Sequence, residues 1–138
     1  MLKLNEIASE LRALLLPEFL TVRISAGRDS GQVGFELQSM HPDRLPGVIV
    51  AFDRFGMTDG GVVRESRFSL ILVDRFIAGN EAKALSLFEG CERLCGLFPP
   101  HGRERRGVTF FPAGCTAAEG GGEYACMIFE VLAKQGIQ

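Results

Sequence analysis

Four cysteines are the residues of this sequence best suited to bind a metal or to carry redox chemistry: Cys91, Cys95, Cys115 and Cys126. A helix would place the thiols of Cys91 and Cys95 on one face, because the two residues are one turn apart. A structural zinc site normally has the tighter Cys-x₂-Cys spacing, preferably twice. Both thiols also fall on an apolar stripe, where a free cysteine behaves as a small hydrophobe. We therefore predict that they pack in the core and bind no metal.

Two sets of residues have the types found in acid–base or nucleophilic catalysis. Ser39, His41 and Asp43 lie close together in the segment SMHPDRLP, but catalytic triads are assembled in space from separate loops, and no G-x-S-x-G motif is present. The flanking prolines favour a turn instead. Asp53 and Asp74 are each followed by an arginine, which is typical of solvated surface charge. An acid–base pair is the alternative that remains open, and no catalytic residue is predicted.

Three arginines form the most concentrated charge, at Arg103, Arg105 and Arg106 in the glycine-bounded segment HGRERRG. A guanidinium group offers planar, multidentate hydrogen bonding to carboxylates and phosphates. We interpret the segment as a polar loop, and a solvated loop without a ligand is favoured, because three arginines fall short of the basic stripe of a nucleic-acid-binding protein. Among the polar features, these arginines are nevertheless the best candidates for contact with a partner protein or DNA.

The glycines do not match a phosphate-binding motif. Gly27, Gly31 and Gly34 lack the spacing of the dinucleotide fingerprint, and no Lys-Ser/Thr pair follows them as in a P-loop. The run at 120–122 lies between two strand patterns, which favours a hairpin loop. No cofactor is predicted.

The composition is that of a globular protein. Among the 138 residues, hydrophobic types make up 46% and charged types 23%, and the formal net charge is −2. The sequence has 11 Phe but only 2 His, which argues against a histidine-rich metal enzyme, and its near-neutral charge argues against nucleic-acid binding by bulk charge. The length suits a single domain over 1–138. Charges interrupt the N-terminal apolar stretch, and no apolar run of about 18 residues occurs, so we expect neither a signal peptide nor a membrane span.

The elements that must position these residues are predicted from hydrophobic periodicity. An amphipathic helix is predicted over residues 4–16 and short strands over 21–25 and 33–37. The clearest element is a long antiparallel hairpin: it consists of GVIVAFDRF as a buried strand, MTDGG as the turn, and VVRESRFSLILVDRF as a central strand with two apolar faces.

A second amphipathic helix is predicted after the hairpin, with Asn80 as its N-cap. Its apolar stripe is formed by Leu85, Phe88, Cys91, Leu94 and Cys95, with Leu87 nearby. Three further segments complete the chain: VTFFP as a short strand, CTAAEGGGE as a flexible turn and EYACMIFEVLA as a buried strand. The predicted fold is α+β, with a mainly antiparallel sheet of about four to six strands packed against two amphipathic helices. The sheet face away from the helices also needs cover, which a partner subunit could provide.

The order of these elements resembles a known family. A helix (LNEIASELRALL) precedes a proline-led strand (LPGVIVAFD), a long strand (ESRFSLILVDRF), a helix (EAKALSLFEGCERLCGLF) and closing strands that end near YACMIFEVLAK. Over nearly its whole length the chain looks like the tail terminator or tail-completion proteins of long-tailed bacteriophages, including those of Mu-like prophages. The likeness rests on element order and on the phrases PGVIV and FSLILV, and the family has no compact motif whose residues carry over.

The resemblance implies a homo-oligomeric ring, commonly a hexamer, that caps the tail tube, stops its polymerisation and joins it to the head. It implies tail-tube and head-completion proteins as partners, passive contact with DNA, no membrane, no catalysis and no cofactor. It also implies a location in the bacterial host cytoplasm during assembly, and in the virion tail if a prophage is active. The alternative function is a small ligand-binding or enzymatic α+β module that uses the sheet edge and the His41–Asp43 loop.

Overall fold

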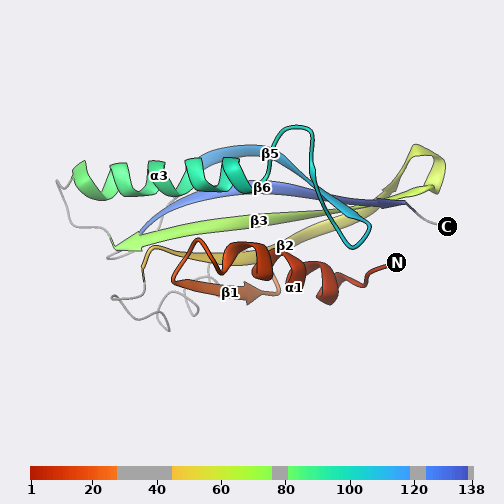
Figure 1. Ribbon diagram of the computed structural model, residues 1–138, viewed down its shortest axis with the longest axis horizontal. Coiled ribbons are helices and arrows are strands. Elements are labelled where there is room, and N and C mark those ends of the chain that lie inside the picture. Colours follow the sequence, from red (N-terminus) through yellow and green to blue (C-terminus); the bar gives the residue numbers. More distant parts are fainter. Residues whose placement is uncertain (28–44, 76–80, 119–123, 137–138) are drawn as a thin grey trace.

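The computed structural model describes residues 1–27, 45–75, 81–118 and 124–136, which form one sheet and two α-helices (Figure 1). In chain order the elements are α1 (Leu4–Leu15), β1 (Thr21–Ser25), β2 (Gly47–Thr58), the 3-10 turn η2 (Asp59–Gly61), β3 (Val63–Arg75), α3 (Glu81–Leu97), β4 (Arg103–Arg105), β5 (Val108–Ala118) and β6 (Tyr124–Gly136). The six strands are ordered β1-β2-β3-β6-β5-β4. β1 and β2 are parallel, and each of the other neighbouring pairs is antiparallel. The predicted α+β class is confirmed.

The predicted long hairpin is formed by β2 and β3. Its strands pair from Gly47 opposite Val73 to Thr58 opposite Val63, and η2 connects them. Asp59, Gly60 and Gly61 all have positive φ angles, as the sequence MTDGG indicates. β3 lies between β2 and β6, so it is the central strand that its two apolar faces predict. The turn end of the hairpin projects beyond the helices at the right of Figure 1.

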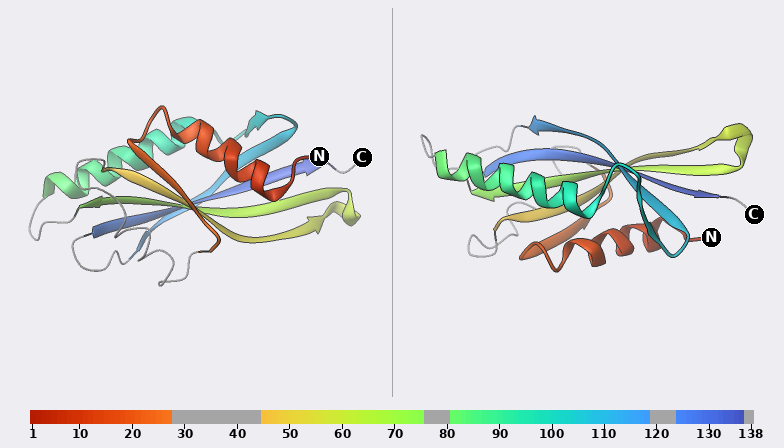
Figure 2. Two further views of the ribbon diagram at one scale, coloured as in Figure 1. Left: turned by 90° about the horizontal axis from the view of Figure 1, so that it is seen from below. Right: turned by 45° about the horizontal axis from the view of Figure 1, so that its top comes forward.

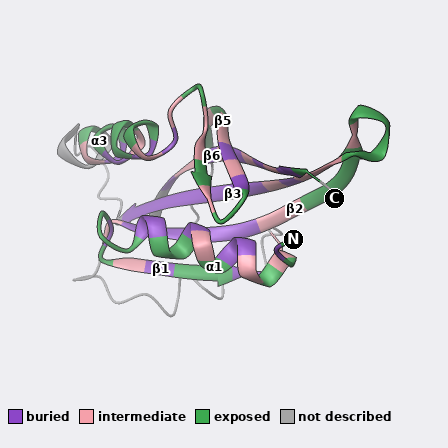
Figure 3. Ribbon diagram, turned by 45° about the vertical axis from the view of Figure 1, so that its right-hand side comes forward, coloured by how far each residue is buried: buried purple, intermediate pink, exposed green. Residues whose placement is uncertain are grey.

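Both helices pack on the same face of the strongly twisted sheet (Figure 2, left). α1 buries the stripe expected from its periodicity, which includes Ile7, Leu11 and Leu15. One continuous core joins this stripe to α3 and to side chains of the central strands such as Phe68 and Leu70. Figure 3 shows these central strands as buried and the projecting end of the hairpin as exposed.

The predicted apolar stripe of α3 was partly wrong. Leu94 is buried and Cys91 packs against the core, as predicted. Leu85 and Phe88 are more than half exposed, and Cys95, which was predicted to pack in the core, is exposed as well. The buried residues instead include Leu87 and, just beyond the helix, Phe98. Gly90 explains the difference, because it is buried among them and lies close to β3. A Cβ atom at Gly90 would be 2.7 Å from Cδ2 of Leu72. The helix therefore packs on β3 at Gly90, and a sequence pattern that counts only large apolar side chains does not include a glycine.

The other face of the sheet has a smaller apolar cluster, formed by Ile49, Ala51, Ile71, Val73 and Cys126. Each of these side chains is at most 5% exposed in the single chain, and Leu45 packs against the cluster. Their apolar character therefore does not by itself require cover from a partner subunit.

The C-terminal half contains more strand than the sequence predicts. The segment VTFFP is only the start of β5, which continues to Ala118 through the part expected to be a flexible turn. The register against β6 shifts between Pro112 and Gly114, which is a β-bulge. The bulge lets the strand pass a proline and a glycine, the residues that make the sequence look like a strand end. The segment HGRERRG is likewise no simple loop, because it contains β4.

Several predictions lie outside the described residues: the strand over 33–37, the Ser39, His41 and Asp43 segment, the Asn80 cap and the glycines at 120–122. Within the described part of the chain, no helix is long and apolar enough to cross a membrane.

Candidate functional site

The three arginines singled out from the sequence belong to the β4–β5 hairpin. Arg103 and Arg105 are the end residues of β4, and Arg106 and Gly107 form a two-residue turn with positive φ angles. Arg103 is half-buried, whereas Arg106 is exposed. The hairpin therefore places the three arginines at one edge of the sheet, since β4 is an edge strand.

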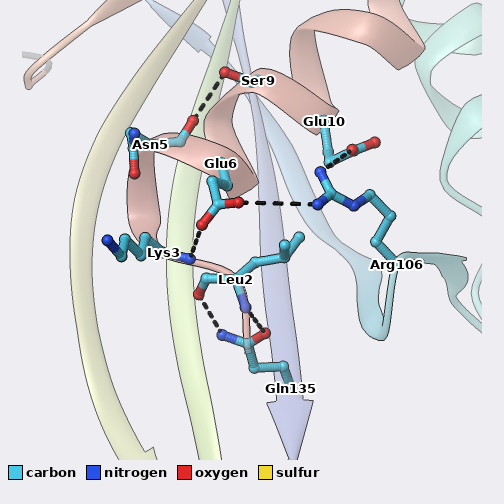
Figure 4. Close-up of polar contacts among 8 residues, drawn as sticks. All are labelled: Leu2, Lys3, Asn5, Glu6, Ser9, Glu10, Arg106 and Gln135. Carbon is cyan, nitrogen blue, oxygen red and sulfur yellow. Dashed lines mark hydrogen bonds and ion pairs between the residues drawn. The ribbon is translucent and has the colours of Figure 1, made fainter.

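Two of these arginines form ion pairs with carboxylates of α1, and Figure 4 shows those of Arg106. Nη1 of Arg106 lies 3.1 Å from Oε1 of Glu10, and Nη2 of Arg105 lies 3.2 Å from Oε2 of the same glutamate. Nη2 of Arg106 is also 3.9 Å from Oε2 of Glu6. Two carboxylates thus balance two guanidinium groups, and the hairpin is held against the helix. The predicted contact of these arginines with a partner or DNA remains a prediction.

The position of α1 is fixed at its N-terminal end. The Leu2 backbone N–H donates to Oε1 of Gln135 at 3.1 Å, and Nε2 of Gln135 donates to the Leu2 carbonyl at 2.8 Å (Figure 4). The Lys3 N–H donates to Oε1 of Glu6 at 3.0 Å, which satisfies one of the open donors near the helix start. These contacts tie the helix to β6, so Glu6 and Glu10 present their carboxylates to the hairpin from a fixed support.

The cysteines form a thiol pair between α3 and β5. The Sγ atoms of Cys91 and Cys115 are 3.3 Å apart, and Cys95 is exposed one turn along the helix from Cys91. Burial raises the pKa of Cys91 to about 11, and the neighbouring Cys115 thiol adds to the rise. Cys126 is buried on the other face of the sheet. Among the described residues no group of three or more His, Cys, Asp and Glu could hold a metal ion.

Asp53 and Asp74 do not form an acid–base pair. Asp53 accepts a hydrogen bond of 2.9 Å from the hydroxyl of Ser69, on the face away from the helices. Asp74 is buried and accepts one of 2.9 Å from the hydroxyl of Ser86 on α3, so it lies on the opposite face. The interpretation of both as solvated charges was wrong for Asp74. His41, which the sequence groups with Ser39 and Asp43, lies outside the described residues.

A polar groove on the face away from the helices was missed from the sequence. It has a volume of about 670 Å³, and its polar side chains are Asp53, Arg54, Arg67 and Glu130. Nη1 of Arg67 lies 3.3 Å from Oε2 of Glu130. The only sequence signal was the alternation of Arg67 and Ser69 with apolar residues along one strand.

Two exposed apolar surfaces were also missed. The first is on the arm, which we define as residues 54–67 of the β2–β3 hairpin and its turn; it exposes Phe55, Met57 and Val62. The second is on the outer face of α3, where Leu85 and Phe88 are exposed. Large apolar side chains that gather on a surface mark interaction sites more often than scattered ones do.

Comparison of the sequence with models of protein families gives no match, and comparison with curated proteins gives none either.

Proposed function

We propose that the chain is a structural subunit of a phage or prophage tail, a tail terminator-like ring subunit that caps the tail tube and contributes to the head–tail junction. The observation that carries the proposal is the presence of two different exposed apolar surfaces, the arm and the outer face of α3, at opposite ends of the molecule (Figure 1). Two different surfaces suit a head-to-tail contact, which closes into a ring when the rotation between subunits allows. The element order supports the same role.

In this role the subunit works by shape. A ring seated on the tube end offers the next tube subunit a surface unlike the tube's own, so growth stops. Arg103, Arg105 and Arg106 are the cations proposed to contact tube or head-completion proteins, or DNA that passes through the ring. The subunit would act in the bacterial host cytoplasm during assembly and then in the virion tail.

The test is tube capping. Tail-tube protein from the same gene neighbourhood is polymerised with and without the chain, and tube lengths and ends are measured by electron microscopy. We expect rings at tube ends, shorter tubes, and a ring mass that is a whole multiple of the subunit mass, sixfold for a hexamer. Tubes of unchanged length without rings at their ends would overturn the proposal. Tubes grown without the chain are the control.

A ligand-binding module is the second candidate, and the polar groove is the observation that favours it. Its two carboxylates and two guanidinium groups suit a zwitterionic small molecule such as an amino acid. Calorimetric titration of an amino-acid panel tests this candidate, with Arg54→Ala as the matched variant. Heat from the wild type that is lost in the variant would support it, and no heat from the panel would reject it.

A further inference from the structure

We propose that the arm of one copy docks on the outer face of α3 of the next copy. The arm contributes Phe55, Met57 and Arg64, which we call the arm patch. The helix contributes Leu85, Phe88, Glu89 and Glu92, which we call the helix patch. The inference rests on the proposed ring and names the surfaces that would build it.

The arm patch lies on the sheet face that the helices cover elsewhere. Phe55 pairs with Ser66 and Met57 pairs with Arg64, so these side chains share the face of the buried Phe68. The arm projects past both helices, and Phe55 and Met57 are therefore 55% and 56% exposed. The arm patch is therefore an extension of the core-facing side of the sheet that is exposed to solvent.

A cation is held within the arm patch. The guanidinium carbon of Arg64 lies 5.0 Å from the centre of the Phe55 ring, a cation–π contact that fixes the side chain beside the apolar surface. A partner for the arm patch therefore needs an apolar centre and a carboxylate close to it.

The helix patch has both features. Leu85 and Phe88 are one turn apart on α3 and are 57% and 54% exposed. Together with Glu89, Glu92 and Arg93 they line a hollow of about 640 Å³. The opposite side of the helix is anchored in the core through Leu94, so the patch is presented on a rigid element.

The geometry indicates that the helix patch binds the arm of a second copy of the chain. The arm and α3 lie at opposite ends of the long axis (Figure 1), so an arm cannot reach the α3 of its own chain. The apolar pairs match, and Arg64 of one copy meets Glu89 or Glu92 of the next. A contact between unlike surfaces is heterologous, and its repetition gives a closed ring or an open filament.

Two variants test the contact by complementation. The arm variant is Phe55→Asp with Met57→Asp, and the helix variant is Leu85→Asp with Phe88→Asp. Each lacks one half of the contact, so each alone is expected to be monomeric in light scattering and sedimentation. A 1:1 mixture is expected to form a dimer and nothing larger, because only one good interface can form. Leu16→Asp with Leu20→Asp is the matched control, since these side chains are equally exposed but outside both patches.

Charge reversal provides a second test of the same contact between the arm patch and the helix patch. Arg64→Glu, and separately Glu89→Lys with Glu92→Lys, are each expected to weaken self-association at least tenfold. Mixing the two reversed chains restores the charge pairing at every contact between unlike chains, because the reversed arm meets the reversed helix patch and the native arm meets the native helix patch. Circular dichroism and the melting temperature verify that every variant is folded.

The outcomes separate the contact from the proposed function. If the single variants keep the wild-type oligomer, or if their mixture stays monomeric, the contact is overturned while the ring still stands. A wild-type chain that remains monomeric up to about 1 mM also overturns the contact. The ring itself is then decided by tube capping, which does not depend on self-association in solution.

Discussion

Glu10 anchors the β4–β5 hairpin because each of its carboxylate oxygens meets a different arginine. Oε1 faces Arg106 and Oε2 faces Arg105, at 3.1 and 3.2 Å. The Glu10 side chain is 12% exposed, so water screens these pairs less than it screens a typical surface salt bridge. The arginines are more open to solvent, which limits what the pairs contribute to stability.

We expect Glu10→Gln to lower the free energy of unfolding by about 1 kcal/mol, because it removes the charge and keeps the side-chain shape. Glu6→Gln is the matched control. The distance from Glu6 to Arg106 is 3.9 Å, and glutamine still accepts the hydrogen bond from the Lys3 N–H. We expect the control to cost less than about 0.5 kcal/mol. Urea denaturation at pH 7 measures both, and equal losses would show that other contacts hold the hairpin.

Two thiols make the fold sensitive to alkali. Burial raises the pKa of Cys91 and of Cys126 from 9.0 to about 11. A pKa that is higher in the folded chain means that folding favours the thiol over the thiolate. This contribution to stability is complete below pH 9 and is lost as the pH rises towards 11.

We therefore expect the urea midpoint to fall between pH 9 and pH 11, and Cys126→Ala to reduce that fall.

At pH 8 iodoacetamide should alkylate the exposed Cys95 faster than Cys91 or Cys126, because alkylation requires access and thiolate. Mass spectrometry of timed samples measures the three rates. Equal rates, or a midpoint that does not change with pH, would contradict the prediction.

The helix α3 is held to the sheet by a close approach at Gly90 as well as by the buried side chains of Leu87 and Leu94. Gly90 faces the buried side chain of Leu72, with no room for a Cβ atom. Gly96 lies near the end of the same helix, and a Cβ atom there would meet nothing within 4 Å. The two glycines therefore separate the effect of packing from that of helix propensity.

Gly90→Ala should lower the free energy of unfolding by about 1 kcal/mol, since overpacking costs more than the gain in helix propensity. Gly96→Ala should raise it by up to about 1 kcal/mol, because only the propensity changes. Thermal denaturation of the two variants should thus shift the melting temperature in opposite directions. A stabilising Gly90→Ala would mean that α3 packs less closely on β3.

The elements that the sequence predicts well are those set by local periodicity. α1 and the β2–β3 hairpin follow from alternating or helical apolar spacing and from a glycine turn. Which side of α3 faces the sheet depends on Gly90, and its role is visible only in the structure, where it lies against Leu72. The predicted strand VTFFP was shorter than β5, because a bulge takes the real strand past Pro112. The pairing of Glu10 with Arg106 spans 96 positions, and no local pattern connects residues so far apart.

The exposed surfaces of the molecule depend on how far the strands reach. β2 and β3 have 12 and 13 residues, and their turn end extends past the helices that cover the rest of the sheet. The sequence pattern assigns Phe55 to a strand and Met57 to the following turn, but exposure is decided by where the covering helices stop. For this reason the arm could not be recognised as a surface from the sequence.

A ring would also change how the arginines meet DNA. One subunit offers few cations, and Glu10 already pairs with two of them, whereas a ring repeats the set around its axis and gains avidity. We expect the assembled ring to bind duplex DNA at least about tenfold more tightly than the monomeric arm variant. Arg103→Ala with Arg106→Ala should weaken binding by the ring, and Arg23→Ala should not. Fluorescence anisotropy at low salt measures this, and equal affinity of ring and monomer would contradict it.

The hydrogen bonds between Leu2 and Gln135 have a consequence for synthesis. They join residues 133 positions apart, and β6, which carries Gln135, lies between β3 and β5 rather than at an edge. While a ribosome is still making β6, the sheet lacks an inner strand and α1 lacks its anchor. The sheet therefore closes only after β6 has been made, and until then β3 and β5 have unpaired edges in the nascent chain.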